Sequence, residues 1–191
     1  MTSNIILNNR GQDVGYVRDM VDFGLREEED FLKYFQETFN IILTKTGQYS
    51  SYDFKINDNI YIEFKSIKLK PFNINDDGKI TLYPHFYIGV DKIDNYKIIY
   101  NSCFNKIKDD TLKKTPTFLY IIKVRYFLKK VINGIETDIE GNRYIFASIS
   151  PYKVMSACKI TTGCDNTNDT KQHYLIPSKW FNNLSYINDI L

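Results

Sequence analysis

Two short runs of alternating apolar and polar residues constrain the fold of this chain more than any other feature. The runs cover residues 52–56 and 60–65, and the Asn-Asp-Asn sequence at 57–59 between them is typical of a tight turn. A three-residue loop sets Phe54 opposite Ile62, so that apolar side chains face apolar side chains across the two strands. The pattern therefore predicts a β-hairpin with one buried apolar face.

The other face of this hairpin carries charge. The same register sets Asp53 directly opposite Glu63. Opposed residues in antiparallel strands have Cβ atoms about 4.5–5.5 Å apart, so the two carboxylates repel each other unless a cation lies between them. Lys65 lies two residues beyond Glu63 and points to the same face. The hairpin thus predicts an acidic pair with a lysine beside it.

A helical segment precedes the hairpin. Apolar residues recur at intervals of three and four over most of 14–42, which is helical periodicity. We expect Gly24 to divide this region into a short helix and a longer one over about 25–42. The acidic run at 27–30 would then lie at the N-terminus of the second helix, where the helix dipole favours negative charge.

Glu28 is the acidic residue that this periodicity aligns with the apolar stripe, four residues before Leu32. A carboxylate on a buried stripe is costly unless it is paired or bound to a metal. If the helix packs near the hairpin, three carboxylates and one lysine converge, and hard oxygen ligands of this kind suit Mg²⁺. Three alternatives stay open: the charged hairpin face is only solvated, Glu28 caps the helix, or Glu27 or Glu29 takes its place after a small rotation.

The rest of the chain predicts further strands and helices around this hairpin. In chain order we expect a loop at 71–79, a strand or irregular piece near 80–90, a helix within 91–114, strands at 117–128 and 144–149, a polar loop at 159–171, a short strand at 174–177 and a terminal helix from Ser178. The sum is an α/β fold with a central mixed β-sheet flanked by helices. We expect one domain over 1–191, with a core over about 14–128 and C-terminal strands and a helix over about 129–191.

Composition limits the classes of protein to which the chain can belong. It has 25 Lys and Arg against 23 Asp and Glu, so any basic surface must be a local patch. Its three cysteines do not make a disulfide framework, which favours a reducing compartment. We expect no signal peptide, and the longest apolar run, at 118–122, is too short to span a bilayer. These features predict a soluble cytoplasmic protein with no membrane partner.

The charged residues follow the pattern of a known family. Asp53, nine further residues and then Glu63-Phe64-Lys65, all preceded by Glu28 in an early helix, resemble the PD-(D/E)xK nuclease superfamily. That superfamily includes restriction endonucleases, archaeal Holliday-junction resolvases and many repair nucleases. The tetrapeptide that begins at Glu63 is especially similar to the resolvase-like branch.

This resemblance covers about residues 24–68, and Tyr52 stands where the pattern of the superfamily has proline. It implies a restriction-endonuclease-like core and a Mg²⁺-dependent DNA endonuclease, in which Mn²⁺ can substitute, that leaves 5′-phosphate ends. A restriction-type enzyme fits the chain length better than a minimal resolvase. For the site, the resemblance implies that Asp53, Glu63 and the main-chain carbonyl of Phe64 bind the metal, that Glu28 holds a metal-bound water or a second ion, and that Lys65 serves the attacking water.

Lysines other than Lys65 are candidates for contacts with DNA. They are Lys68, Lys70, Lys106, Lys108, Lys113 and Lys114. Double-strand cutting needs two active sites, which implies a two-fold homodimer, and we expect no organic cofactor. The alternatives are a structure-specific resolvase or repair nuclease of the same fold, a non-cleaving DNA- or protein-binding module with that fold, and an unrelated interaction domain whose hairpin only displays charge.

Overall fold

The computed structural model describes residues 14–47, 50–70, 80–108, 115–162 and 171–191. The loop expected at 71–79 and the candidate DNA-binding residues Lys113 and Lys114 lie outside these ranges. None of the helices in the described ranges is long and apolar enough to cross a membrane.

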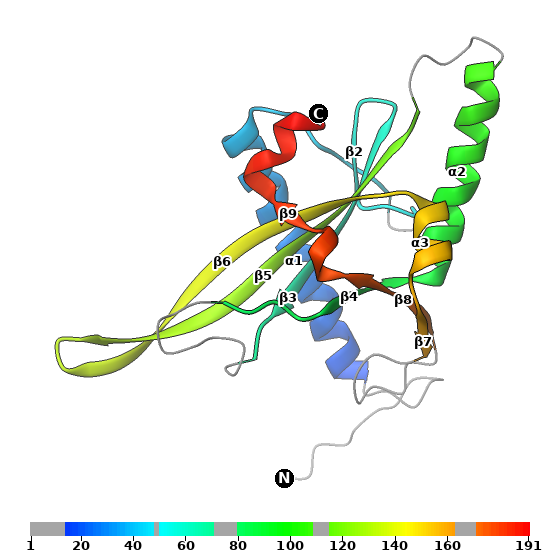
Figure 1. Cartoon of the computed structure of the whole chain (residues 1–191). Helices are drawn as coiled ribbons and strands as arrows, with labels where there is room; N and C mark the ends of the chain where they lie inside the picture. Colours follow the sequence, from blue (N-terminus) through cyan, green and yellow to red (C-terminus); the bar gives the residue numbers. More distant parts are fainter. Residues whose placement is uncertain (1–13, 48–49, 71–79, 109–114, 163–170) are drawn as a thin grey trace.

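Within the described residues, a six-stranded mixed sheet forms the centre of the molecule (Figure 1). Its strands, in spatial order, are β1 (Thr44–Lys45), β2 (Phe54–Ile56), β3 (Ile60–Lys68), β5 (Thr117–Ile132), β6 (Ile135–Ile149) and β9 (Asn182–Asn183). Strands β3 and β5 are parallel, and the other neighbouring pairs of this sheet are antiparallel. Helices flank the sheet, so the predicted α/β class with a central mixed sheet is confirmed.

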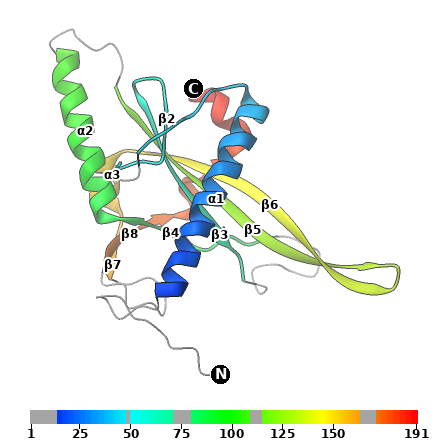
Figure 2. The same ribbon diagram turned by 180° about the vertical axis from the view of Figure 1, so that it is seen from behind.

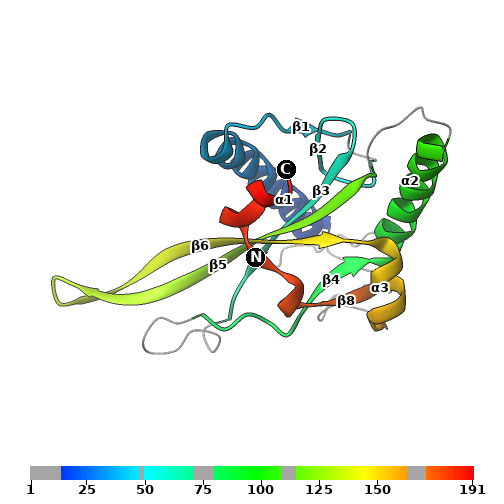
Figure 3. The same cartoon turned by 45° about the horizontal axis from the view of Figure 1, so that its top comes forward.

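The two faces of this sheet are covered by different elements. Helix α1 (Val14–Phe39) crosses one face (Figure 2), and the 3₁₀ segment η3 (Leu184–Asp189) packs in the same apolar core. The other face is covered by a small sheet and by helical segments (Figure 3). The small sheet consists of β4 (His85–Gly89), β8 (Gln172–Pro177) and β7 (Ile160–Thr162). The helical segments are α2 (Val90–Lys108), α3 (Pro151–Ala157) and the 3₁₀ segment η2 (Ser178–Trp180). The main sheet therefore lies between two apolar layers.

The alternation of side chains along β3 sets which face carries the charge. Phe64 points toward α1, where Phe31 stacks on it with ring centroids 4.4 Å apart. Tyr61 belongs to the core on the opposite face. Because successive side chains of a strand point to opposite faces, Glu63 and Lys65 share the face of Tyr61, which α2 and β4 cover.

The first hairpin has the predicted register. Phe54 pairs with Ile62, and Asn57 in the turn has a φ of 54°, a value that asparagine tolerates better than most residues. The first strand is shorter than expected, because Asp53 directly precedes β2. The Asp53 N–H donates to the carbonyl of Ile62 at 2.9 Å, so Asp53 remains attached to the neighbouring strand.

Gly24 does not divide the first helix, contrary to our expectation. Helix α1 is continuous from Val14 to Phe39, and Asn40, with a φ of 54°, follows its last residue. A glycine inside a helix costs only about 1 kcal/mol relative to alanine, and packing of the apolar face onto the sheet offsets this cost. The acidic run at 27–30 therefore lies in the middle of the helix, where Glu27 and Glu28 meet cations of the sheet.

The β5–β6 hairpin is longer than predicted and projects from the body of the molecule (Figures 1 and 3). Its turn lies at Asn133 and Gly134, which have φ values of 53° and 79°. The return strand was expected at 144–149, but β6 begins at Ile135 and includes Gly141. A Cβ atom at Gly141 would come within 2.3 Å of the ring of Tyr126, so glycine here permits a close approach between paired strands.

The C-terminal part departs most from the sequence-based prediction. Strand β7 lies within the expected polar loop at 159–171, and η2, β9 and η3 replace the terminal helix expected from Ser178. Helix α3 was not predicted, although Ser150 before Pro151 is a common helix start. Segments this short contain too few residues for periodicity to separate a helical turn from a strand.

Candidate functional site

Asp53 and Glu63 come together beside the first hairpin. The Phe64 N–H donates to Asp53 Oδ2 at 2.8 Å, which ties the start of β2 to β3. The side chain of Glu63 is 16% exposed. The charge of Asp53 is among the causes that raise the pKa of Glu63, as expected for two neighbouring carboxylates.

A lysine that the sequence did not single out binds Glu63. Lys92 Nζ lies 2.8 Å from Glu63 Oε2, and the hydroxyl of Tyr96 donates to the same oxygen at 3.5 Å. Lys92 and Tyr96 are one turn apart on α2, which begins directly after β4, so this helix brings both side chains to Glu63. The four-residue spacing is visible in the sequence, but the packing of α2 on β3 is not.

Glu28 approaches Asp53 from α1. Its carboxylate forms an ion pair with Lys45 of β1, with Oε2 and Nζ 3.0 Å apart. Both residues line a cavity of about 490 Å³ together with Asp53 and Lys92. The charge of Glu28 is also among the causes that raise the pKa of Asp53. The structure therefore places Glu28 and Asp53 at one cavity.

Glu27, and not Glu28, is the acidic residue that points into the core. Glu27 is 7% exposed, and its carboxylate oxygens lie 2.9 Å from Lys123 Nζ and 3.8 Å from a guanidinium nitrogen of Arg125. The expectation that Glu28 lies on the core-facing stripe is therefore wrong, and the alternative in which Glu27 takes its place is the one observed. The buried stripe runs through Glu27 and Phe31, and this rotation of the helix leaves Glu28 on the cavity.

Lys65 shares a face with Glu63, but the lysine in contact with Glu63 is Lys92. The side chain of Lys65 is exposed, and its charge is among the causes that lower the pKa of Glu63. Lys65 lines a separate cavity of about 440 Å³ on that face. Two lysines from different elements therefore act on one carboxyl group.

Burial dominates the electrostatics of the acidic pair. Desolvation raises the pKa of Glu63 to about 8, and the charge of Asp53 acts in the same direction against the ammonium of Lys92. Desolvation also raises the pKa of Asp53 above its ordinary value, although the hydrogen bond from Phe64 opposes it. Burial lowers the pKa of Lys92, but the two carboxylates outweigh that effect and raise it overall. The pair therefore favours binding of a further cation, whether a proton or a metal ion.

The raised pKa of Glu63 predicts how the stability of the metal-free protein depends on pH. Between pH 4.5 and about 8, the folded protein keeps a proton on Glu63 that the unfolded chain releases. The free energy of unfolding should therefore fall as the pH rises through this window, by on the order of 4 kcal/mol. Urea unfolding in EDTA on both sides of the window measures the change.

Glu63→Gln is the matched variant for this measurement, because it removes the titrating group and keeps its shape. The wild type should lose stability relative to Glu63→Gln as the pH rises. Glu136→Gln, at an exposed position of the β5–β6 hairpin, should follow the wild type. Parallel profiles for the wild type and Glu63→Gln would show that the folded protein does not keep a proton on Glu63.

The acidic pair has suitable ligands for a divalent cation but is not already arranged around one. Among the described residues, no group of three or more His, Cys, Asp or Glu side chains is spaced to hold a metal ion. Asp53 Oδ2 and Glu63 Oε2 accept hydrogen bonds, and the second oxygen of each carboxylate has no such partner within the described ranges. Since Mg²⁺ is commonly held by one or two carboxylates and several waters, these residues fit Mg²⁺.

The remaining candidate DNA-binding lysines are only partly described. Lys68 Nζ lies 4.5 Å from the ring centroid of Phe127, and Lys70 is exposed just beyond β3. Lys106 and Lys108 belong to the last turns of α2, and their side chains are outside the described part. A continuous basic surface along these lysines therefore stays a prediction.

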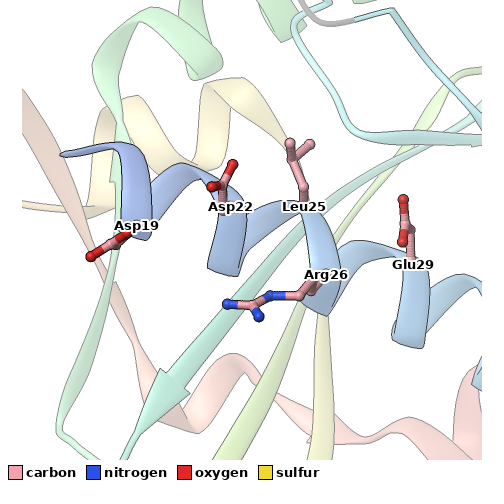
Figure 4. Close-up of a pocket in the computed structure, with 5 residues that line it drawn as sticks. All are labelled: Asp19, Asp22, Leu25, Arg26 and Glu29. Carbon is pink, nitrogen blue, oxygen red and sulfur yellow. The ribbon is translucent and has the colours of Figure 1, made fainter. Parts of the chain in front are cut away.

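A larger hollow, of about 750 Å³, lies along α1 and shares Leu25 with the cavity of Asp53 and Glu28. Its described lining consists of Asp19, Asp22, Leu25, Arg26 and Glu29 (Figure 4). All five side chains come from one helix, and Figure 4 shows Leu25 and Arg26 pointing to different sides of it. A hollow whose described lining is a single helix brings no distant parts of the chain together, so we place the candidate site at the smaller cavity of Asp53 and Glu28.

No protein-family model, curated protein or solved structure matches this chain. The candidate site is therefore defined by geometry alone. Side chains from α1, β1, the start of β2, β3 and α2 supply three carboxylates and two lysines in direct contact with them. The elements are far apart in the sequence, and the fold brings them to one place.

Proposed function

We propose that this protein is a Mg²⁺-dependent DNA endonuclease that hydrolyses phosphodiester bonds and leaves 5′-phosphate ends. The observation that carries the proposal is that Asp53, Glu28 and Lys92 line one cavity, with Glu63 in contact with Lys92. Two desolvated carboxylates side by side are unfavourable, and a bound divalent cation offsets this cost. The resemblance of residues 24–68 to PD-(D/E)xK nucleases supports the same function.

The carboxylates would hold the metal and the lysines would act on the phosphate. Asp53 and Glu63 would be ligands together with the main-chain carbonyl of Phe64, and Glu28 would hold a metal-bound water or a second ion. When bound, Mg²⁺ lowers the pKa of a coordinated water and neutralises charge on the phosphoryl group. The hydrogen bond from Phe64 to one oxygen of Asp53 orients the other oxygen for this purpose.

Lys65 would orient the attacking water or stabilise the negative charge that develops on the phosphate. The water oxygen bonds to phosphorus while the bond from phosphorus to the 3′ oxygen breaks, so the phosphate stays on the 5′ end. Lys92, which contacts Glu63 in the metal-free protein, would contact the same phosphate once a metal binds Glu63. Both lysines already act on the carboxyl of Glu63.

A non-cleaving DNA-binding module with the same site is the second candidate. It is favoured by the two ion pairs of the site, Lys92 with Glu63 and Lys45 with Glu28, because these neutralise carboxylates without a metal. Such a module would bind DNA through its lysines and would have no need of Mg²⁺.

We further propose a restriction-type role, with a structure-specific resolvase or repair nuclease as the alternative within the same chemistry. Cutting both strands of a duplex requires two sites, so the proposal includes a two-fold homodimer. It also includes an intracellular location, where DNA is the substrate and the cysteines stay reduced.

Incubation with supercoiled plasmid, linear duplex and a four-way junction, with and without Mg²⁺, tests these proposals. A nuclease gives products that require Mg²⁺ or Mn²⁺ and end in 5′-phosphate. A binding module gives gel shifts and no products in either metal. A protein that gives neither shifts nor products would be the unrelated interaction domain, and the nuclease proposal would be wrong.

A further inference from the structure

A second cavity lies on the same face of the main sheet, beyond Glu63. It has a volume of about 440 Å³, and we call it the aromatic cavity. Its lining includes Lys65, Lys70, Tyr83, His85, Tyr87 and Tyr120, and none of its described lining residues is acidic. Its size lies within the range of about 300–1,000 Å³ that is typical of ligand pockets.

Residues that line the candidate-site cavity and residues that line the aromatic cavity both neighbour Glu63. Lys92 lines the candidate-site cavity, Lys65 lines the aromatic cavity, and the charges of both lysines act on the Glu63 carboxyl. Glu63 is also the register partner of Tyr120 on β5, which lines the aromatic cavity. A nucleic-acid strand with its reacting phosphate at Glu63 therefore has a neighbouring nucleotide at the aromatic cavity.

The rings of Tyr83 and Tyr120 at the aromatic cavity are held in place without a ligand. The Tyr83 hydroxyl accepts from the N–H of Lys70 at 3.2 Å and donates to the carbonyl of Lys68 at 3.4 Å. The Tyr120 hydroxyl donates to the carbonyl of Tyr87 at 2.7 Å, which fixes β4 on the main sheet. Tyr87 itself is 39% exposed. Rings that are already fixed lose little side-chain freedom when a ligand binds.

Three lysines, Lys65, Lys68 and Lys70, line the cavity with these rings, and two of them are candidates for a phosphate contact. Lys65 and Lys70 are exposed, and within the part of the chain that the structure describes neither forms an ion pair. Aromatic side chains stack bases and lysines bind phosphates, and proteins that bind single-stranded nucleic acid combine the two contacts. The cavity therefore has groups for both parts of one nucleotide.

We propose that the aromatic cavity binds one unstacked nucleotide, with its base against Tyr87 and its phosphate at Lys65 and Lys70. The identification of this nucleotide as part of the strand that is cut rests on the proposed function. The substrate class is then DNA in which the nucleotide next to the cleavage position is either unpaired or flipped out of the duplex when the protein binds. A nucleotide that stays stacked in the duplex does not reach the cavity.

Binding measurements in EDTA test this nucleotide site without cleavage. Fluorescence anisotropy compares a fluorescein-labelled single strand with a duplex of the same length. Tyr87→Ala should weaken binding of the single strand by about 5- to 150-fold, the range expected for loss of one stacked base. Tyr87→Phe keeps the ring and should bind like the wild type. Tyr186→Ala, at a 63% exposed tyrosine of η3, is the matched control and should leave the affinity unchanged.

Lys70→Ala provides a second variant at an exposed side chain, in case Tyr87→Ala disturbs the fold. It should weaken single-strand binding and reduce the slope of log affinity against log salt by about 0.7, as expected for one lost phosphate contact. Unchanged affinity in folded Tyr87→Ala and an unchanged salt slope in Lys70→Ala would overturn the nucleotide site.

These results separate the nucleotide site from the proposed function. Binding that depends on Tyr87, in a wild type that gives no cleavage products with Mg²⁺, would reject the nuclease and keep the nucleotide site. Cleavage that depends on Glu63, with single-strand binding that does not depend on Tyr87, would keep the nuclease and reject the nucleotide site.

Discussion

Glu63→Gln should abolish Mg²⁺-dependent cleavage of plasmid DNA while the protein stays folded. The substitution removes one of the two carboxylates at the acidic pair and keeps the size and shape of the side chain. A metal contributes several kcal/mol to stabilisation of phosphoryl charge, so the rate of cleavage should fall by about 10³-fold or more. The initial rate of conversion of supercoiled plasmid to open-circular and linear forms measures the effect.

Glu37→Gln is the matched control for this prediction. Glu37 lies on the same helix as Glu28, its side chain is 66% exposed, and it is not part of the cavity. Its substitution should leave the cleavage rate within a factor of about two, since an exposed ion pair contributes little. Cleavage by Glu63→Gln at a rate close to that of Glu37→Gln would contradict the role that we assign to Glu63.

Lys123→Ala should lower the free energy of unfolding more than Glu63→Gln, Glu136→Gln, Lys70→Ala or Glu37→Gln does. Lys123 is 6% exposed and lies 2.9 Å from the buried carboxylate of Glu27. Its removal leaves that carboxylate with Arg125 alone, at 3.8 Å. Loss of one partner from a buried ion pair typically costs about 3–5 kcal/mol, and we expect a fall of about 3 kcal/mol in the free energy of unfolding. The midpoint and slope of urea unfolding measure it.

Two further variants separate burial from charge in this prediction. Lys33→Ala breaks an exposed pair whose side chains are 77% and 66% exposed, and it should change the stability by less than about 1 kcal/mol. The double variant Glu27→Gln with Lys123→Met removes both charges and should recover most of the lost stability. If Lys123→Ala were no less stable than Lys33→Ala, the buried ion pair would not be a stabilising feature of this fold.

The register of the first hairpin could be predicted because it depends on local sequence. Alternating apolar residues and a turn that tolerates positive φ leave one pairing that keeps Phe54 and Ile62 on the buried face. The same locality placed Asp53 next to Glu63. Such local patterns predict the observed pairing because the two strands of a hairpin pair with each other regardless of how the rest of the chain folds.

The rotation of the first helix could not be predicted in the same way. Adjacent residues of a helix differ by about 100° in direction, so a small error in the buried stripe exchanges Glu27 and Glu28. We expected a break at Gly24, and that break would have let the acidic run begin a new helix. The continuous helix is fixed by its contacts with the sheet, among them the stacking of Phe31 on Phe64, and these contacts are not local.

The contact of Lys92 with Glu63 could not be predicted from the sequence, because the two residues are 29 positions apart. The spacing of Lys92 and Tyr96 indicates only that they share a helix face. Which part of the molecule that face meets depends on the path of the chain through β4 and back over β3. The cation in contact with Glu63 therefore came from a helix whose position no local pattern determines.

Anomalous diffraction from crystals of the protein soaked in Mn²⁺ is the most direct test of the shared cation site. We predict one peak within about 2.5 Å of carboxylate oxygens of both Asp53 and Glu63. Lys92 Nζ should then lie further from Glu63 than its present 2.8 Å. No peak at these carboxylates, with the contact between Lys92 and Glu63 unchanged, would contradict the proposal that they hold a catalytic metal.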